Sequence, residues 1–217
     1  MKIKPFVCII MATMMEAEPF INLFGLAEIE GRPFPVYKGN DTLLIISGIG
    51  KAYAAMATAY ACSEFIPERI LNLGAAGATD VSQELGSIYQ IEKTVEPDRP
   101  HLRSNTPYIQ SLEILPGFPN AVLATQDKAV TTVEDFREIA RFADLVDMEG
   151  ASIVQTCKRF EKKCLLFKFV SDTSEHAGQG QIIDHIKYYR DPFCEFIFDS
   201  VIPAIKREEP PKHNNSI

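Results

Sequence analysis

The sequence predicts a single α/β domain in which a mixed central β-sheet is flanked by helices on both sides. Short apolar runs, such as residues 6–11 and 164–170, lack polar alternation and are typical of strands buried on both faces. These runs alternate along the chain with helical segments, as in α/β proteins. The 217 residues contain no repeat, low-complexity segment or convincing linker, and this length suits one domain.

The N-terminal segment begins with a buried strand followed by an amphipathic helix. The strand is the compact apolar run at residues 6–11. Phe20, Ile21 and Phe24 then share one face of a helix over residues 16–24, and a glycine follows it directly.

A hairpin and a helix of small residues come next. Apolar segments at 35–38 and 43–47 flank a Gly-Asn-Asp sequence, which predicts a tight turn between two strands. The glycines of residues 48–50 open an Ala-rich helix over 51–65, whose small side chains suit close packing. A short buried strand is expected at 70–73.

The remaining elements follow from the same two signals, apolar runs for strands and helical spacing for helices. Strands are expected over residues 87–95, 121–125, 145–146 and 164–170. Helices are expected over residues 133–142, 148–160, 181–189 and 192–205, and a Pro-rich connection over 97–119.

The charge balance argues against two broad classes of protein. The chain has 22 basic and 29 acidic residues, a formal net charge of −7. Proteins that bind nucleic acid or anionic membranes through their general surface carry a basic excess instead. No stretch approaches the roughly 20 apolar residues of a membrane span. We therefore expect neither nucleic acid nor membrane as a partner.

The five cysteines are scattered and odd in number, without the CxxC spacing of zinc sites or a disulfide framework. We interpret them as reduced thiols of a cytoplasmic protein. No metal-ligand cluster or dinucleotide fingerprint is present, so no metal and no organic cofactor is expected. Residues 207–217 are charged and contain Pro and Asn, which predicts a disordered tail after a domain spanning residues 1–206.

Polar residues gather where the predicted strands end, which is where open α/β sheets bind ligands. Glu16 follows the first strand, Gly74–Gly77 follows a middle strand, and Asp147–Glu149 lies at a strand-to-helix junction. Lys168, Ser171 and Asp172 end the last strand. Each has an ordinary structural explanation alone, such as a helix-terminal carboxylate, a cap or a turn. Their joint position at strand ends favours a site.

Five motifs in register make the chain resemble the methylthioadenosine/S-adenosylhomocysteine nucleosidases of the purine nucleosidase and nucleoside phosphorylase superfamily. They are residues 12–16 (Ala-Thr-Met-Met-Glu), 47–51 (Ser-Gly-Ile-Gly-Lys), 72–77 (Asn-Leu-Gly-Ala-Ala-Gly), 146–149 (Val-Asp-Met-Glu) and 171–172 (Ser-Asp). The likeness extends from Phe6 to about Ile205. Residues 47–51 are not a P-loop, because the GxxxxGK[ST] spacing fails.

The resemblance implies hydrolysis of the N-glycosidic bond of a purine nucleoside. Asp172 would protonate purine N7 as the general acid, and Glu16 would activate the attacking water. Glu149 would hold the ribose hydroxyls, with Met148 lying against the ribose. Lys168 takes the place of a basic family residue near the water. The remaining residues that the resemblance places at the base and the nucleophile are Ala75, Ala76, Gly77, Val130 and Ser171.

The early loop separates hydrolases from phosphorylases in this resemblance. Phosphorylases need anion donors, an Arg-bearing early loop and a hydroxyl in the Gly-rich loop. Here the early loop carries Glu16, a carboxylate that repels phosphate, and Ala75 stands where Ser is common. We therefore expect hydrolysis of a 5′-modified, adenine-containing nucleoside. A futalosine or aminofutalosine hydrolase, a phosphate-dependent phosphorylase and a catalytically silent nucleoside-binding relative remain alternatives.

The chain departs from the family pattern in two places. Ala129 stands where the family has the aromatic residue that stacks on the purine. The segment between Gly77 and Asp127 is shorter than in the family, whose usual homodimer closes the 5′ pocket with residues from this region. His101, Arg103 and Tyr108 are the candidates to replace them, although exposed loop positions explain these residues equally well.

Further residues have two interpretations each. Asp127 and Lys128 could face the base or pair with each other, and a surface pair is favoured for Lys128. His176 follows the Ser-Asp motif and could reach the site, whereas His185 is expected to be structural. A homodimer is expected, and Met56, Ala59 and Phe65 could belong to its interface or to the core.

Overall fold

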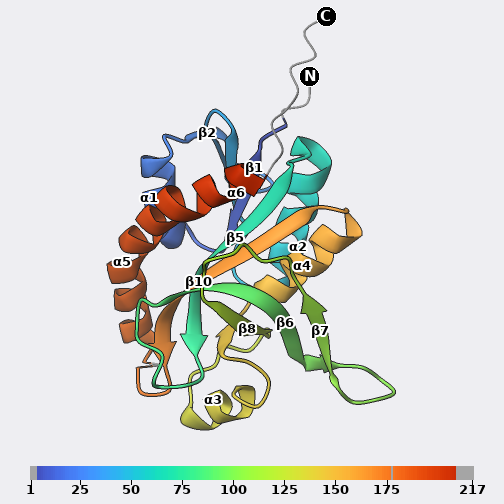
Figure 1. Cartoon of the computed structure of the whole chain (residues 1–217), viewed down its shortest axis with the longest axis vertical. Coiled ribbons are helices and arrows are strands. Elements are labelled where there is room, and N and C mark those ends of the chain that lie inside the picture. Colours follow the sequence, from blue (N-terminus) through green and yellow to red (C-terminus); the bar gives the residue numbers. More distant parts are fainter. Residues whose placement is uncertain (1–3, 177, 209–217) are drawn as a thin grey trace, which may run out of the picture.

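The computed structural model describes residues 4–176 and 178–208, which form one mixed ten-stranded sheet with helices on both faces (Figure 1). The path of the sheet is β10-β6-β8-β9-β5-β1-β4-β3-β2, and β7 pairs with β6. The strands are β1 Val7–Met11, β2 Ala27–Glu30, β3 Val36–Lys38, β4 Thr42–Ile46, β5 Arg69–Ala78, β6 Ile88–Pro100, β7 Pro107–Ser111, β8 Asn120–Thr125, β9 Leu145–Asp147 and β10 Lys163–Thr173.

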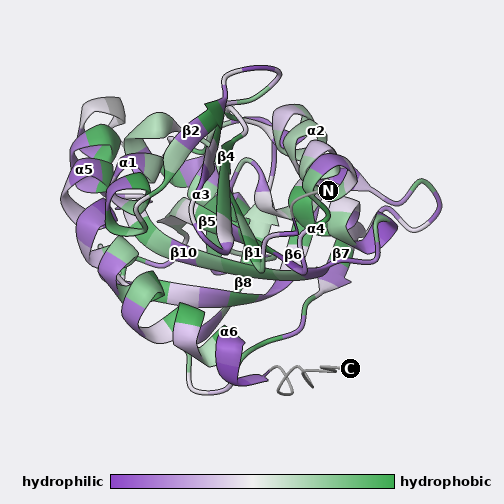
Figure 2. Ribbon diagram, turned by 90° about the horizontal axis from the view of Figure 1, so that it is seen from above, coloured by the Kyte–Doolittle hydropathy of each residue, from purple (hydrophilic) through white to green (hydrophobic). Residues whose placement is uncertain are grey.

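Two groups of helices cover the sheet, as seen from above in Figure 2. The first group, α1, α5, η2 and α6, buries Phe20 and Phe193 against one face, and the second, α2 and α4, buries Ala57 and Ile153 against the other. The helices are α1 Met14–Leu23, α2 Lys51–Tyr60, η1 Ala61–Phe65, α3 Val133–Ile139, α4 Gly150–Arg159, α5 Gln179–Phe196, η2 Ile197–Val201 and α6 Ile202–Glu208. The predicted layered α/β architecture is confirmed.

Strand β1 explains why the central strands read as unbroken apolar runs. Val7, Ile9 and Met11 pack in the core beneath α1 and α5, while Cys8 and Ile10 pack in the core beneath α2 and α4. Successive side chains of a strand point to opposite faces, so a strand covered on both sides must be apolar at every position.

The sheet also closes on itself, which the sequence pattern does not predict. β10 runs parallel to β5 along most of its length, and its residues 167–169 pair antiparallel with β6. From β6 the sheet continues through β8 and β9 back to the end of β5. β5 consequently has different neighbours along its length, β1 at residues 69–72 and β9 at residues 77–78.

The C-terminal helices form one continuous rod, where the sequence predicts two helices. Pro192 lies inside α5, although a proline in a helix interior costs about 3 kcal/mol. The rod buries Phe193, Cys194, Ile197 and Val201 against the sheet. Burial of four apolar side chains, at about 1.5–3 kcal/mol for each large one, outweighs that cost.

The structure also bears on the residues proposed for a dimer interface and on the predicted C-terminal tail. Phe65 is buried in the core beneath α2, so it is not an interface residue, whereas Met56 is exposed. The predicted tail lies mostly outside the described residues, and α6 extends to Glu208. Among residues 4–176 and 178–208, no helix is long and apolar enough to cross a lipid bilayer.

Candidate active site

The site lies where β5 loses a neighbouring strand. Residues 69–72 of β5 pair with β1 and residues 77–78 pair with β9, so residues 73–76 have no strand partner on that side. Open α/β sheets bind ligands at such divergences, because backbone groups that would join strands face a crevice instead. Ala75 illustrates this, since its backbone N–H donates to a side chain rather than to a strand.

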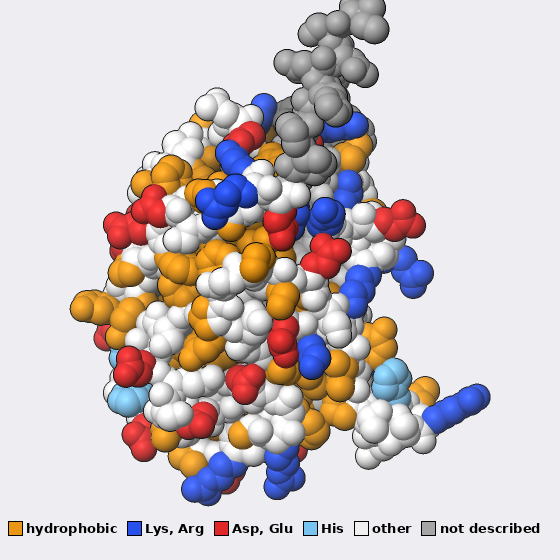
Figure 3. Space-filling model, viewed as in Figure 1, with side chains coloured by type: hydrophobic (Ala, Val, Ile, Leu, Met, Phe, Trp, Pro, Cys, Tyr) orange, Lys and Arg blue, Asp and Glu red, His pale blue; other side chains and the backbone are white. Residues whose placement is uncertain are grey.

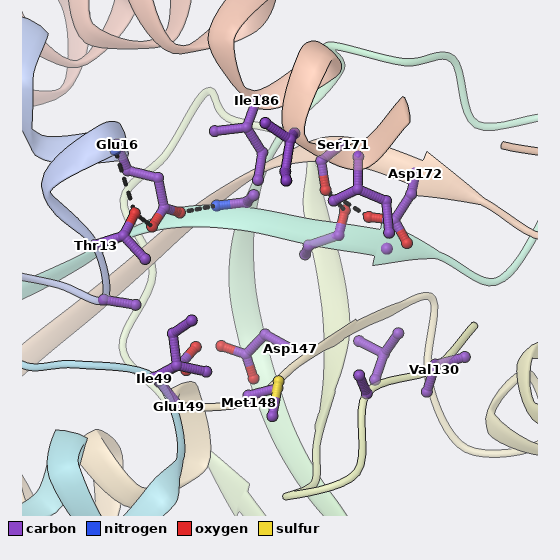
Figure 4. Close-up of a pocket in the computed structure, with 18 of the residues that line it drawn as sticks. Thr13, Glu16, Ile49, Val130, Asp147, Met148, Glu149, Ser171, Asp172 and Ile186 are labelled. Atoms are coloured by element: carbon purple, nitrogen blue, oxygen red, sulfur yellow. Dashed lines mark hydrogen bonds between the residues drawn. The ribbon is translucent and has the colours of Figure 1, made fainter. Parts of the chain in front are cut away.

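A cavity of about 430 Å³ opens at this divergence. It is lined from the starts of α1 and α4, from β5 and β10, from the loop after β8 and from α5 (Figure 4). Its walls contain the following polar and apolar residues: Ala12, Thr13, Met15, Glu16, Ile49, Ala75, Ala76, Gly77, Lys128, Ala129, Val130, Thr131, Val146, Asp147, Met148, Glu149, Ser171, Asp172, Ile182, Ile183 and Ile186.

Glu16 is held at one end of the cavity by two donors. The Thr13 hydroxyl donates to Oε2 at 2.6 Å, and the Ala75 backbone N–H donates to Oε1 at 3.0 Å. Thr13 is also the N-cap of α1 and accepts from the Glu16 backbone N–H at 3.3 Å. One threonine therefore starts the helix and orients the carboxylate, which is only 6% exposed.

Asp172 occupies the opposite end of the cavity (Figure 4). The Ser171 hydroxyl donates to its Oδ1 at 2.5 Å. Burial raises the pKa of Asp172, and this effect exceeds the opposing influence of the Ser171 hydrogen bond and of His185. A carboxyl group in this environment holds its proton to a higher pH than an exposed aspartate does.

The two glycines of the Gly-Ala-Ala-Gly sequence make room for these two carboxyl groups. A Cβ atom added to Gly74 would lie 2.8 Å from Oε1 of Glu16, and one added to Gly77 would lie 2.6 Å from Oδ2 of Asp172. Both distances are shorter than any contact a side-chain carbon tolerates. The absence of a side chain at Gly74 and at Gly77 thus lets the carboxyl groups of Glu16 and Asp172 lie close against β5.

A buried ion pair lies beneath the cavity floor. The Lys168 ammonium on β10 is 2.9 Å from Oδ2 of Asp147, and both side chains are at most 2% exposed. Burial alone would lower the pKa of Lys168, but the carboxylates of Asp147, Glu149 and Glu16 raise it, so the lysine stays charged. Thr125 and the Gly150 N–H also donate to Asp147, at 2.6 and 2.9 Å.

Glu149 completes this charged group, which we term the carboxylate end: Glu16, Asp147 and Glu149 with Lys168. Burial and the neighbouring Asp147 raise the pKa of Glu149 to about 7, although Lys168 and the Gly50 N–H act in the opposite direction. The Gly50 N–H donates to Oε1 of Glu149 at 2.7 Å.

The opposite wall is a loop without charged partners in the cavity. We term residues 128–131 the loop wall; it presents Ala129 and Val130, and the exposed Lys128 pairs with Asp135 at 2.9 Å. Among the described residues that line the cavity, none is aromatic. The larger apolar side chains elsewhere in the lining are Met15, Ile49, Val146, Met148 and three isoleucines of α5.

The structure brings together nearly all the residues that the sequence singled out. Of the residues that the resemblance assigned to the reaction, the sugar and the base, every one lines the cavity except Lys168, which pairs with the lining residue Asp147. His101 and Tyr108 instead pack against each other at a ring distance of 5.1 Å, on the arm between β6 and β7 that projects at the lower right of Figure 3. Arg103 belongs to the same arm and does not line the cavity.

Sequence reasoning missed several contributors. The sequence placed Thr13, Gly50 and Asp147 in its motifs but assigned them no role, because they act through hydrogen bonds that only the folded chain creates. His185 lies closer to the site than its helical position suggested, since its Nδ1–H donates to the Ser171 carbonyl at 2.8 Å. His176 contacts the Thr173 hydroxyl at 3.1 Å. Only Thr13 had a sequence signal, the capping pattern of a threonine three residues before a glutamate.

Across residues 4–176 and 178–208, no group of three or more His, Cys, Asp or Glu side chains is arranged to hold a metal ion. The polar groups that the site does hold are its carboxyl groups, the buried Lys168 and backbone donors.

A family model described as the phosphorylase superfamily matches residues 7–131, more than half of the chain. The chain therefore belongs to the phosphorylase superfamily. Within it, the 5′-methylthioadenosine/S-adenosylhomocysteine nucleosidase of Bacillus cereus is 26% identical, over 75% of this chain and 83% of the relative. The corresponding nucleosidase of Buchnera aphidicola is 25% identical, over 76% and 83%. The family resemblance seen in the motifs is confirmed.

Solved structures show the same fold. The apo 5′-methylthioadenosine nucleosidase of Arabidopsis thaliana superposes with a TM-score of 0.84 at 20% identity, covering 96% of this chain and 98% of that one. A futalosine hydrolase mutant of Helicobacter pylori superposes with a TM-score of 0.78 at 20% identity, covering 94% and 99%. Relatives with different substrates in their names thus share this architecture.

Proposed function

We propose that this protein hydrolyses the N-glycosidic bond of a purine nucleoside, with a 5′-modified adenine nucleoside such as methylthioadenosine or S-adenosylhomocysteine as substrate. The observation that carries the proposal is the placement of Glu16. Its carboxylate is oriented by Thr13 and Ala75 at one end of the cavity, with Asp172 at the other.

The two acids suit the two halves of the reaction. Glu16 accepts a proton from water, whose oxygen attacks C1′ of the ribose as the bond from C1′ to the base nitrogen breaks. Asp172 donates a proton to N7 of the base, so the base leaves as a neutral molecule. The raised pKa of Asp172 supports this role, because a general acid must carry its proton near neutral pH.

The sugar-binding role falls to Glu149 and Met148. An ionised Glu149 accepts hydrogen bonds from ribose hydroxyls and places negative charge near the positive charge that develops on the sugar. Its position is fixed by the Gly50 N–H at 2.7 Å. Met148 supplies an apolar surface beside it.

The hydrogen bond between the Ala75 backbone N–H and Glu16 favours hydrolysis over phosphorolysis. That N–H, which could otherwise face an anion, already donates to Glu16. A phosphate ion would have to displace this carboxylate and then lie beside it, which like charges in a buried site oppose. Ala75 also offers no hydroxyl to such an anion.

The test is incubation of the purified protein with nucleosides in phosphate-free buffer, followed by mass spectrometry. The panel contains methylthioadenosine, S-adenosylhomocysteine, 5′-deoxyadenosine, adenosine, inosine and aminofutalosine. We expect free base and free sugar, with Glu16→Gln as an inactive control that keeps the size of the side chain. A sugar 1-phosphate formed only after phosphate is added would contradict the proposed hydrolysis.

The absence of an aromatic residue among the described cavity residues favours testing one second substrate class. Ala129 leaves the base without the usual stacking partner, so a nucleoside with a different base or 5′ group is the alternative. Preferential cleavage of aminofutalosine would identify a futalosine-type hydrolase. Nucleoside binding without cleavage of any panel member would identify a silent binding protein.

A further inference from the structure

A cluster of charged side chains lies outside the cavity, around Lys51 at the start of α2. The Lys51 ammonium contacts both carboxylate oxygens of Asp98 at 2.8 Å, and the same ammonium lies 3.7 Å from the Glu96 carboxylate and 3.8 Å from the Asp127 carboxylate. We term these four residues the Lys51 junction. They come from α2, from β6 and from the loop after β8, so one side chain ties together three separate segments.

Lys51 and Glu96 are more buried than a typical surface ion pair, whereas Asp98 and Asp127 are 33% and 68% exposed. The Lys51 side chain is only 16% exposed and that of Glu96 only 3%. Glu96 is itself held by the Arg99 guanidinium at 2.6 Å and by a hydrogen bond from Gln155. A partly buried network with several partners resists screening by water and salt more than an exposed pair does.

The backbone extends the junction toward both sides of the cavity. The Lys51 N–H donates to Oδ1 of Asp127 at 3.3 Å, and the Asp127 N–H donates to Asp98 at 3.2 Å. Gly50, which precedes Lys51, holds Glu149 at the carboxylate end. Asp127 directly precedes the loop wall.

Val130 anchors the loop wall, because it is buried in a core cluster with Phe136 and Val146, but the rest of the loop has few restraints. Residues 128–131 belong to no helix or strand, and the pair that Lys128 forms with Asp135 is exposed. Gln126 donates from its side chain to the Lys128 carbonyl at 2.8 Å, and its backbone N–H donates to the Asp147 carbonyl at 3.2 Å. Lys51 adds the charged attachment of the loop to α2, through Asp127.

We propose that Lys51 is a positioning residue for base recognition, which holds the loop wall at the distance from Glu149 that a bound nucleoside requires. The inference rests on the proposed function, since it assigns the loop wall to the base and Glu149 to the ribose. Lys51 touches no substrate in this proposal. It acts through Asp127 on one side and through Gly50 on the other.

The test compares Lys51→Met, Lys51→Arg and Asp127→Asn with the wild type. Lys206→Met is the matched control, because Lys206 forms an exposed pair with Asp41 at 3.0 Å, remote from the cavity. We expect Lys51→Met to raise KM about 10-fold, with kcat changed by less than about threefold, the pattern of lost binding rather than lost chemistry. Lys51→Arg should restore most of the affinity, because arginine keeps the charge.

Two measurements are independent of turnover. Hydrogen exchange of backbone amides in residues 126–131 should be faster in Lys51→Met than in the wild type and unchanged in Lys206→Met. The affinity for free adenine, measured by calorimetry, should fall about 10-fold in Lys51→Met, in parallel with KM.

The outcomes separate this inference from the proposed function. Unchanged exchange in residues 126–131, or faster exchange with unchanged adenine affinity, would overturn the role of Lys51. A lower melting temperature in Lys51→Met with unchanged KM and adenine affinity would do the same, since it indicates stability alone. A wild type that binds adenine but cleaves no nucleoside would overturn the proposed function, while the exchange and calorimetry data would still decide the role of Lys51.

Discussion

At the carboxylate end of the cavity each acid has a fixed donor or cation, whereas the loop wall at the other side consists of small and aliphatic residues. Glu16, Asp147 and Glu149 are oriented by Thr13, Ala75, Gly50 and Lys168. The loop wall offers Ala129 and the core-anchored Val130, and Asp127 attaches it from outside the cavity. The comparison teaches that the groups proposed to serve the sugar and the water have fixed polar partners, while the wall proposed to face the base is an apolar loop.

The largest expected effect concerns Asp172, the acid beside the loop wall. Asp172→Asn should lower kcat by about 10²–10⁴-fold, because the amide keeps the shape but cannot donate an acidic proton. Nucleoside affinity should change little. Steady-state kinetics and direct binding measure the two effects separately, with exposed Asp184→Asn as the control. Unchanged turnover in Asp172→Asn would exclude general acid catalysis by this residue.

The next largest expected effect is the loss of folding stability when the buried cation of the carboxylate end, Lys168, is removed. Lys168→Met should destabilise the protein by about 3–5 kcal/mol, because Asp147 would remain buried without its partner. Lys128→Met, which breaks the exposed pair with Asp135, should cost less than about 1 kcal/mol. Urea denaturation of both variants tests the contrast. Equal stability losses would show that burial does not distinguish the two pairs.

Glu149 should make stability depend on pH. Its pKa is raised from the ordinary 4.5 to about 7 in the folded protein, so its contribution to stability is complete below pH 4.5 and is lost as pH rises through 7. Glu149→Gln keeps an acceptor for the Gly50 N–H and removes the titration. The variant should gain about 1–3 kcal/mol relative to the wild type at pH 8 and little at pH 4.5.

Denaturation of both proteins at the two pH values is the measurement for Glu149. A stability difference that is the same at pH 4.5 and at pH 8 would show that Glu149 is not the group responsible.

The smallest expected effect lies at the loop wall. Ala129→Phe should tighten adenine binding by about 2- to 10-fold, the range that an added aromatic contact of about 0.5–1.5 kcal/mol provides. Ala129→Leu is the control, because it adds volume without a ring. Calorimetry distinguishes the two variants, and equal gains in both would attribute the effect to volume rather than to stacking.

The sequence predicted the layered fold and the strand-end position of the site because both depend on local signals. Unbroken apolar runs identified the covered strands, but residues 74–77, expected to follow a strand at 70–73, belong to β5, which extends to Ala78 because β10 and β9 pair with it there. The closure of the sheet through β10 and β6 was not predictable, because pairing between strands far apart in the chain leaves no periodic signature. Pro192 was misleading for a related reason, since the burial that outweighs its cost is tertiary.

The partners of the site residues required the structure. Lys168 pairs with Asp147 and is not among the residues that line the cavity, while its place near the attacking water stays a prediction. Asp127 was expected to face the base or to pair with Lys128, but it contacts Lys51 from α2. These contacts join residues more than 20 positions apart, and no spacing rule along one chain specifies them. The roles of the site residues and a homodimer remain predictions.

The open stretch of β5 also has a consequence for competition between anions. Because Glu16 is tethered to α1, its carboxylate meets the Ala75 N–H at an effective concentration set by the fold rather than by the solution. Intramolecular groups with short connections reach effective concentrations of millimolar or far higher. A dissolved anion must exceed that local concentration to take the donor, so the position of Glu16 in the first turn of α1 raises the anion concentration that competition requires.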